Sequence, residues 1–155
     1  MKEMQGTITF LRNNARLPLA ELGRPECPLE LVVPYTNPAL TAQALATATN
    51  LARGFEAEVT LMAVYVLPYP SPLECQEGIR KRLEADLTAL ARTSPASIHV
   101  KLVFARDRVD AYLGLLPPQS LVVIGTKDRW WRTREESLAR RLTSGGHSVA
   151  VIKVR

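Results

Sequence analysis

The sequence predicts an α/β fold, with a parallel sheet that carries helices on both faces, and three observations support this. Five short stretches rich in Val, Leu and Ile alternate with four stretches in which apolar residues recur at helical spacing. Turn-forming residues such as Pro34, Gly54 and the Pro117-Pro118 pair separate these stretches. Strands that alternate with amphipathic helices need crossover connections, and these make neighbouring strands parallel.

The predicted strands are short and apolar, and several are rich in β-branched residues. They lie at residues 29–33, 58–66, 98–104, 121–125 and 148–154. The third alternates apolar residues with His99 and Lys101, which indicates an edge strand with one wetter face. The fourth is a continuous apolar run closed by Gly125, which is typical of a strand buried on both faces.

The predicted helices have recognisable start or stop signals. They lie at residues 38–53, 73–93, 107–116 and 135–142. Thr36 or Asn37 can cap the first helix, and Pro38 suits its first turn. The Gly145-Gly146 pair ends the last helix. Residues 29–155 therefore form one domain, and residues 1–28 precede it as an N-terminal arm.

The arm contains a candidate strand at residues 7–11, and three prolines, Pro18, Pro25 and Pro28, interrupt the rest of it. It is either a loosely attached segment or an arm that packs on a partner subunit.

Composition excludes several classes of protein. The chain has 155 residues, which suit one domain, and a formal net charge of +5. Its basic residues are mostly interleaved with acidic ones, so nucleic-acid binding is not expected. No run of eighteen apolar residues predicts a membrane span. Cys27 and Cys75 lack metal or redox spacing, which favours free thiols in a cytoplasmic protein.

Three stretches of the domain together resemble the universal stress protein family. They are LVVPYT with the Ala-rich helix after it, VTLMAVYV, and LVVIGT followed by SLARRL and VAVIKV; they begin at residues 31, 59 and 121. The resemblance implies an open five-stranded parallel sheet in the order 3-2-1-4-5, similar to that of the adenine-nucleotide α-hydrolases. Many members of the family bind ATP through the pattern G-x2-G-x9-G-[ST], whose glycines bring backbone N–H groups close to phosphates.

This chain departs from that pattern. Gly125 matches the first glycine, Asp128 stands at the second, and Glu136 stands at the third if Ser137 is the matching hydroxyl. The loop is then two residues shorter than the pattern, and the acidic residue usual at the end of the first strand is replaced near Pro34. The candidate ligand-binding residues are those at the ends of the first and fourth strands and the hydroxyl of the pattern: Tyr35, Thr36, Gly125, Thr126, Lys127 and Ser137. Because two carboxylates would face a triphosphate, we expect no cofactor or only weak binding of ATP.

The loop after the fourth strand carries two tryptophans, Trp130 and Trp131, among basic residues. It can bind a protein partner or a small anion, or it can be a solvated face whose indoles fold back over the end of the sheet. His99 and His147 have no carboxylate and nucleophile at a telling spacing, so no enzymatic activity is expected.

We therefore predict a non-catalytic regulatory protein that acts through dimerisation and binding, and the resemblance to the universal stress proteins implies that it acts in a stress response. The alternative is an ATP-binding member with an altered phosphate loop. The strand at 148–154 is nearly all apolar, and an edge strand of this kind needs a cover. Because the equivalent strand pairs across a two-fold axis in the family that the chain resembles, we expect a homodimer through this C-terminal strand.

Overall fold

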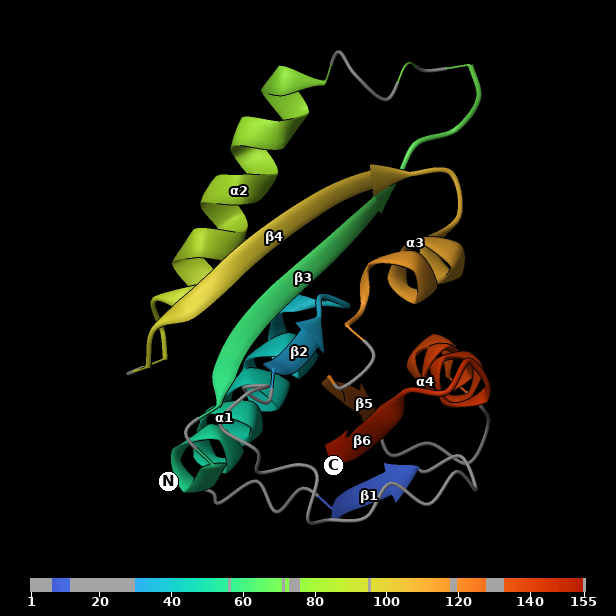
Figure 1. The fold of residues 1–155 in the computed structure, drawn as a ribbon. Coiled ribbons are helices and arrows are strands. Elements are labelled where there is room, and N and C mark those ends of the chain that lie inside the picture. The colour runs from blue at the N-terminus through green and yellow to red at the C-terminus, as the bar shows by residue number, and fades with distance from the viewer. Residues whose placement is uncertain are drawn as a thin grey trace.

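The computed structural model describes residues 30–55, 57–70, 72, 76–94, 96–117, 120–127 and 133–154, and the backbone alone of residues 7–11. Within this part of the chain, six strands form one sheet and four helices pack on it (Figure 1). The strands are β1 (Thr7–Leu11), β2 (Glu30–Pro34), β3 (Glu58–Val66), β4 (Ile98–Ala105), β5 (Leu121–Lys127) and β6 (Ser148–Val154). The helices are α1 (Pro38–Phe55), α2 (Glu77–Ala91), α3 (Arg108–Leu115) and α4 (Arg134–Ser144).

The sheet order is β1-β6-β5-β2-β3-β4. Its five parallel strands are β2, β3, β4, β5 and β6, and their arrangement is the predicted order 3-2-1-4-5. The first of them, β2, is central, and β4 lies at one end of the sheet with His99 and Lys101 exposed. The predicted fold and the edge position of β4 are therefore confirmed.

The other end of the sheet differs from the expectation. Strand β1 pairs antiparallel with β6, from Thr7 opposite Lys153 to Leu11 opposite Val149. The expectation that the C-terminal strand forms the sheet edge is wrong, because a strand from residues 7–11 takes that position (Figure 1). The candidate strand in the arm is confirmed, and the remainder of residues 1–28 lies outside the described residues.

Side chains on alternate positions of the strands enter two separate cores. In β5, Val123 joins the core under α1 and α2, while Val122 and Ile124 join the core under α3 and α4. A strand buried on both faces needs apolar residues at successive positions, which explains the continuous apolar run in its sequence. Helices on both faces of the sheet are thus confirmed.

Helix boundaries follow local chemistry closely. Helix α1 begins after Asn37, whose side-chain Oδ1 accepts the N–H of Leu40 at 2.9 Å, as an N-cap does. Helix α4 ends before Gly146, which has a φ of 94° that a residue with a side chain rarely adopts. Among the described residues, no helix has the length and apolarity needed to cross a membrane.

Candidate functional site

The carboxyl end of β2 holds the first two predicted site residues, Tyr35 and Thr36. The Tyr35 N–H donates to the carbonyl of Met62 at 2.8 Å, and the Thr36 N–H donates to Oγ1 of Thr41 at 3.1 Å. Pro34 has no N–H to offer. The backbone N–H groups at this end of the strand are therefore committed to the protein itself.

Two side chains from α3 complete this region, and the sequence analysis missed both. Arg108 donates from Nη2 to the carbonyl of Tyr35 at 2.7 Å, and the Tyr112 hydroxyl donates to the carbonyl of Met62 at 3.2 Å. Tyr112 is fully buried, and this burial raises the pKa of its phenol, with the nearby Arg108 cation acting in the opposite direction. Asp107 caps α3 through its side chain, which accepts the N–H of Asp110. Arg108 and Tyr112 are four residues apart, so they lie one turn apart on the same face of this helix.

Two buried polar atoms in this region have no hydrogen-bond partner within the described structure. They are the Oγ1 of Thr36 and the Nε of Arg108. Buried polar groups usually have partners, so these atoms hold the unused hydrogen-bonding capacity at the end of β2. Because both atoms are buried, a small polar molecule would reach this hydroxyl and this guanidinium N–H only after the surrounding side chains moved.

The end of β5 holds three further predicted residues. A Cβ added at Gly125 would lie 2.5 Å from the carbonyl oxygen of Leu40 in α1, so the glycine lets that helix approach the strand. Thr126 is buried, and its hydroxyl shares a 2.8 Å hydrogen bond with that of Thr133. Lys127 is exposed. Of these three residues, only Lys127 presents its side chain to solvent.

The first turn of α4 holds Ser137, the last predicted residue. Oγ1 of Thr133 accepts the N–H of Glu136 at 3.2 Å, and the Thr133 carbonyl accepts the N–H of Ser137 at 3.1 Å. Glu135 and Glu136 both lie in this first turn, where the helix dipole favours negative charge. The chain thus supplies its own cap and its own acidic residues at a helix end that would otherwise suit a phosphate.

The contacts divide the predicted residues into two groups. Tyr35 and Thr36 belong with α3 and the start of α1, whereas Thr126 and Ser137 belong with Thr133 at the β5–α4 junction. Gly125 lies against Leu40, near the start of α1. Asp128, Arg129, Trp130, Trp131 and Arg132 lie outside the described residues, so the roles of this loop stay predictions.

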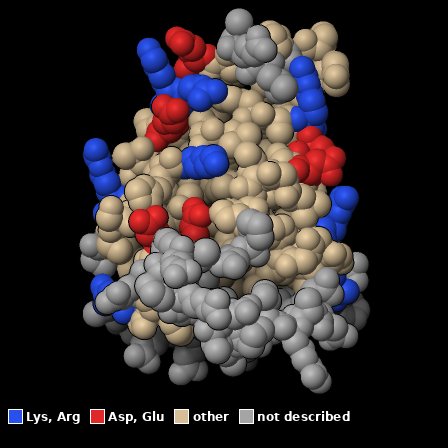
Figure 2. Space-filling view, in the orientation of Figure 1, with Lys and Arg blue, Asp and Glu red and all other residues tan. Residues whose placement is uncertain are grey.

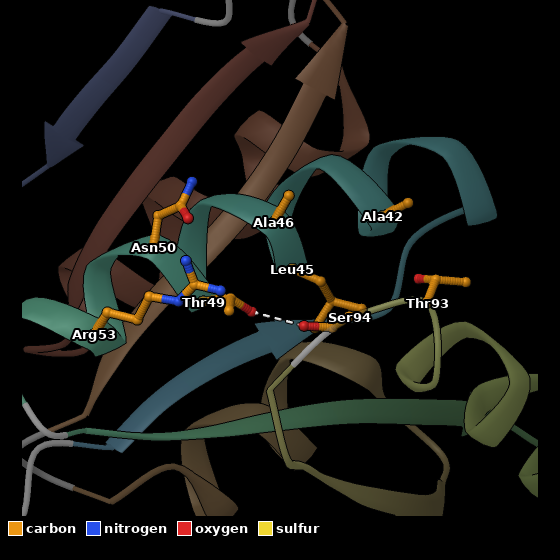
Figure 3. Close-up of a pocket in the computed structure, with 8 residues that line it drawn as sticks. All are labelled: Ala42, Leu45, Ala46, Thr49, Asn50, Arg53, Thr93 and Ser94. Carbon is orange, nitrogen blue, oxygen red and sulfur yellow. Dashed lines mark hydrogen bonds between the residues drawn. The ribbon is translucent and has the colours of Figure 1, made fainter.

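A groove of about 180 Å³ lies elsewhere, between the outer face of α1 and the turn after α2 (Figure 3). Small and polar side chains line it, and a 3.0 Å hydrogen bond joins the hydroxyls of Thr49 and Ser94 across it. None of the predicted site residues belongs to its lining.

Within the described residues, no group of three or more His, Cys, Asp or Glu side chains is arranged to hold a metal ion. His99 is exposed on β4, while His147 is buried before β6, where burial lowers the pKa of its imidazole.

Comparison with known proteins identifies the fold. No protein-family model matches the chain, and no curated protein matches it in sequence. A solved structure of the universal stress protein from Archaeoglobus fulgidus in complex with dAMP does match, with a TM-score of 0.56 over 82% of this chain and 98% of that one. The chain has the universal stress protein fold.

Two further structures with the universal stress protein fold agree. The UspA protein from Lactobacillus plantarum covers 82% of this chain and 97% of its own, with a TM-score of 0.54 and 16% identity. A universal stress protein in complex with cAMP covers 82% and 96%, with a TM-score of 0.51 and 19% identity. The Archaeoglobus fulgidus protein is 17% identical. At these identities the comparison shows that the universal stress proteins and this chain share a fold. It confirms the fold that the sequence resemblance implied.

Proposed function

We propose that the protein is a non-catalytic regulatory protein that acts by binding, in which the nucleotide pocket of the universal stress protein fold has degenerated. The role in a stress response comes from the family resemblance, and the degenerate pocket comes from residues of this chain. The binding region comprises the carboxyl ends of β2 and β5.

The observation that carries the proposal is the N-terminus of α4. A phosphate at a helix N-terminus needs free N–H groups and gains from the positive end of the helix dipole. Here Thr133 accepts the N–H of Glu136, and the carboxylates of Glu135 and Glu136 lie in the first turn. Each carboxylate close to a phosphate would cost on the order of 1 kcal/mol at a partly screened surface. Two of them would weaken binding about thirtyfold.

The committed backbone at the end of β2 supports the same conclusion. Tyr35 and Thr36 already donate their N–H groups within the protein, and Arg108 already holds the carbonyl of Tyr35. A nucleoside would have to displace these contacts or bind without them. A bound nucleoside would then gain few hydrogen bonds from the backbone of residues 34–36.

The second candidate function is nucleotide binding through an altered loop. It is favoured by the unpartnered Oγ1 of Thr36 and Nε of Arg108, which offer a hydroxyl and a cationic donor at the end of β2. Two of the proteins with the same fold have dAMP or cAMP bound. In this case the phosphates would be held by residues other than the first turn of α4.

Isothermal titration with Mg-ATP, ADP and AMP separates the two candidates. We expect no saturable binding of ATP below about 1 mM. A variant with Glu135→Gln and Glu136→Gln removes both charges while keeping side-chain size, and we expect it to bind more tightly than the natural chain. Glu58→Gln with Asp86→Asn is the control, because it removes two exposed carboxylates far from α4 and so makes the same change in net charge. A micromolar dissociation constant for the natural chain would overturn the degenerate pocket.

A further inference from the structure

The outer edge of β4 is the other end of the sheet. Within the described residues β4 pairs only with β3, and no strand pairs with its far side (Figure 1). Eight residues long, this edge presents alternate N–H and C=O groups that another strand can bond. Ile98, Val100 and Leu102 pack against the core under α1 and α2, whereas His99 and Lys101 are exposed on the other face.

Helix α2 packs over β4 and presents one flank beyond it. Leu87 and Ala91 are its buried residues, and Leu90 packs on the same core as the α1 side chains. At 100° per residue, Leu90 lies to one side of that buried row. Thr93, which follows three residues later, lines a groove against α1, so this side of α2 faces α1. Glu77, Lys81, Glu84 and Thr88 lie on the opposite side, which therefore faces past the edge of the sheet. We call these four residues the outer flank of α2.

The outer flank is self-complementary when two copies run antiparallel. Along it, Glu77 is negative, Lys81 positive, Glu84 negative and Thr88 neutral. Antiparallel alignment about the midpoint between Lys81 and Glu84 brings each Lys81 next to the Glu84 of the other copy. Both signs of charge are interspersed over the region of α2 in the space-filling view (Figure 2).

The centre of β4 lies near the centre of the outer flank of α2. Antiparallel pairing of β4 with a second β4 about Leu102 places Lys101 opposite Val103, so no two like charges lie directly opposite. The guanidinium of Arg80 lies over the ring of Phe104 at 5.1 Å, which fixes α2 along the strand. Leu102 lies two residues, or about 7 Å, before Phe104 along β4. The same distance along α2 corresponds to between four and five residues after Arg80. The centre of the outer flank therefore lies within one helical turn of Leu102.

We propose that the β4 edge and the outer flank of α2 form a homodimer interface, in which the second copy pairs antiparallel about Leu102. A two-fold axis perpendicular to the sheet relates the strands, so the two α2 helices lie side by side on the same face. The occupant of this edge is a second copy of the chain, because one two-fold axis gives both the pairing of the β4 strands about Leu102 and the contacts between Lys81 and Glu84 of the two copies. This interface is independent of the nucleotide site.

Sedimentation equilibrium of the full chain and three variants tests the interface. We expect twice the chain mass for the natural protein. Lys81→Glu places like charges next to each other twice, and we expect it to raise the dimer dissociation constant about tenfold at low salt. Adding Glu84→Lys to this variant exchanges the two charges and should restore the natural value.

The matched control is Arg82→Glu, which makes the same change in net charge one position further along α2. Arg82 is exposed and lies on the side of the helix away from the outer flank. Equal weakening by Lys81→Glu and Arg82→Glu would overturn the proposal. So would a monomer mass for the natural chain at tens of micromolar, or a double variant as weak as Lys81→Glu.

A cysteine cross-link tests the register, in a background with Cys27→Ser and Cys75→Ser. Across the proposed axis the two Leu102 Cβ atoms lie about 5 Å apart, so Leu102→Cys should form a disulfide-linked dimer on mild oxidation. The two His99 positions would lie about 20 Å apart, so His99→Cys should not cross-link. Cross-linking at His99, or none at Leu102, would overturn the register about Leu102.

Discussion

Arg108 donates a 2.7 Å hydrogen bond from its guanidinium to the carbonyl of Tyr35, and thereby ties the start of α3 to the end of the central strand. One turn later in α3, the hydroxyl of Tyr112 binds the carbonyl of Met62 on the neighbouring strand. These two contacts fasten the carboxyl end of β2 and the middle of β3 to one helix. The carboxyl end of the central strand, near which open α/β sheets generally bind ligands, is thus held by a guanidinium and a phenol.

Replacing Arg108 with Met should lower the free energy of unfolding by about 1–2 kcal/mol, because a hydrogen bond from a charged donor to a half-buried carbonyl is lost. Urea denaturation measures the change. Arg140→Met, at an exposed position of α4, is the control and should change stability by less than about 0.5 kcal/mol. Equal stability of the two variants would show that the Arg108 contact does not hold α3.

Replacing Gly125 with Ala should destabilise the protein by about 2 kcal/mol or more, since the new Cβ would lie 2.5 Å from the Leu40 carbonyl and the α1 backbone would have to move. Gly114→Ala is the matched control, because nothing lies within 4 Å of the Cβ that it adds in α3. This control should stabilise the protein by about 0.5–1 kcal/mol. Thermal unfolding of both variants measures the difference, and a tolerated Ala at position 125 would contradict the close contact.

His147 should make stability depend on pH. Burial lowers the pKa of its imidazole from the ordinary 6.5, so the folded chain keeps it neutral where the unfolded chain protonates it. Below about pH 6.5 the unfolded state binds more protons than the folded state, so the free energy of unfolding decreases as the pH is lowered. The decrease stops once the pH is below the lowered pKa of the folded state.

The variant His147→Gln removes this titration. Urea midpoints measured from pH 8 to pH 5 should show a smaller decline for the variant than for the natural chain. The comparison uses the slope with pH, so a constant cost of burying Gln does not affect it. Parallel curves for the two proteins would rule out His147 as the source of the decline.

Deleting residues 1–11 should uncover the apolar edge of β6, because β1 pairs along that edge. We expect the shortened chain to associate further than the full chain, which light scattering measures. The homodimer through the C-terminal strand that the sequence predicts stays a prediction, and pairing of two β6 strands would need β1 to leave that edge. Identical masses for the shortened and full chains would show that β1 does not protect β6.

The sequence predicts most of the fold and part of the site, for reasons that specific residues illustrate. The order of helices and strands follows from periodicity and from stop signals such as Gly146, which are local properties. The partner of β6 is not predictable in this way, because residues 7–11 pair with it from the far end of the chain. Arg108 was missed since no motif marks it; the Asp107 cap and the buried Tyr112 one turn on were the available signals.

The pairing of Thr7 with Lys153 also bears on how the protein folds during synthesis. Among the described strands, β1 leaves the ribosome first, yet the strand it pairs with, β6, leaves last. Contacts of such high sequence separation slow folding, because loop closure precedes the gain from pairing. The parallel strands β2 to β5 can assemble while the chain is still growing, and closure of the sheet by β1 is then the final step.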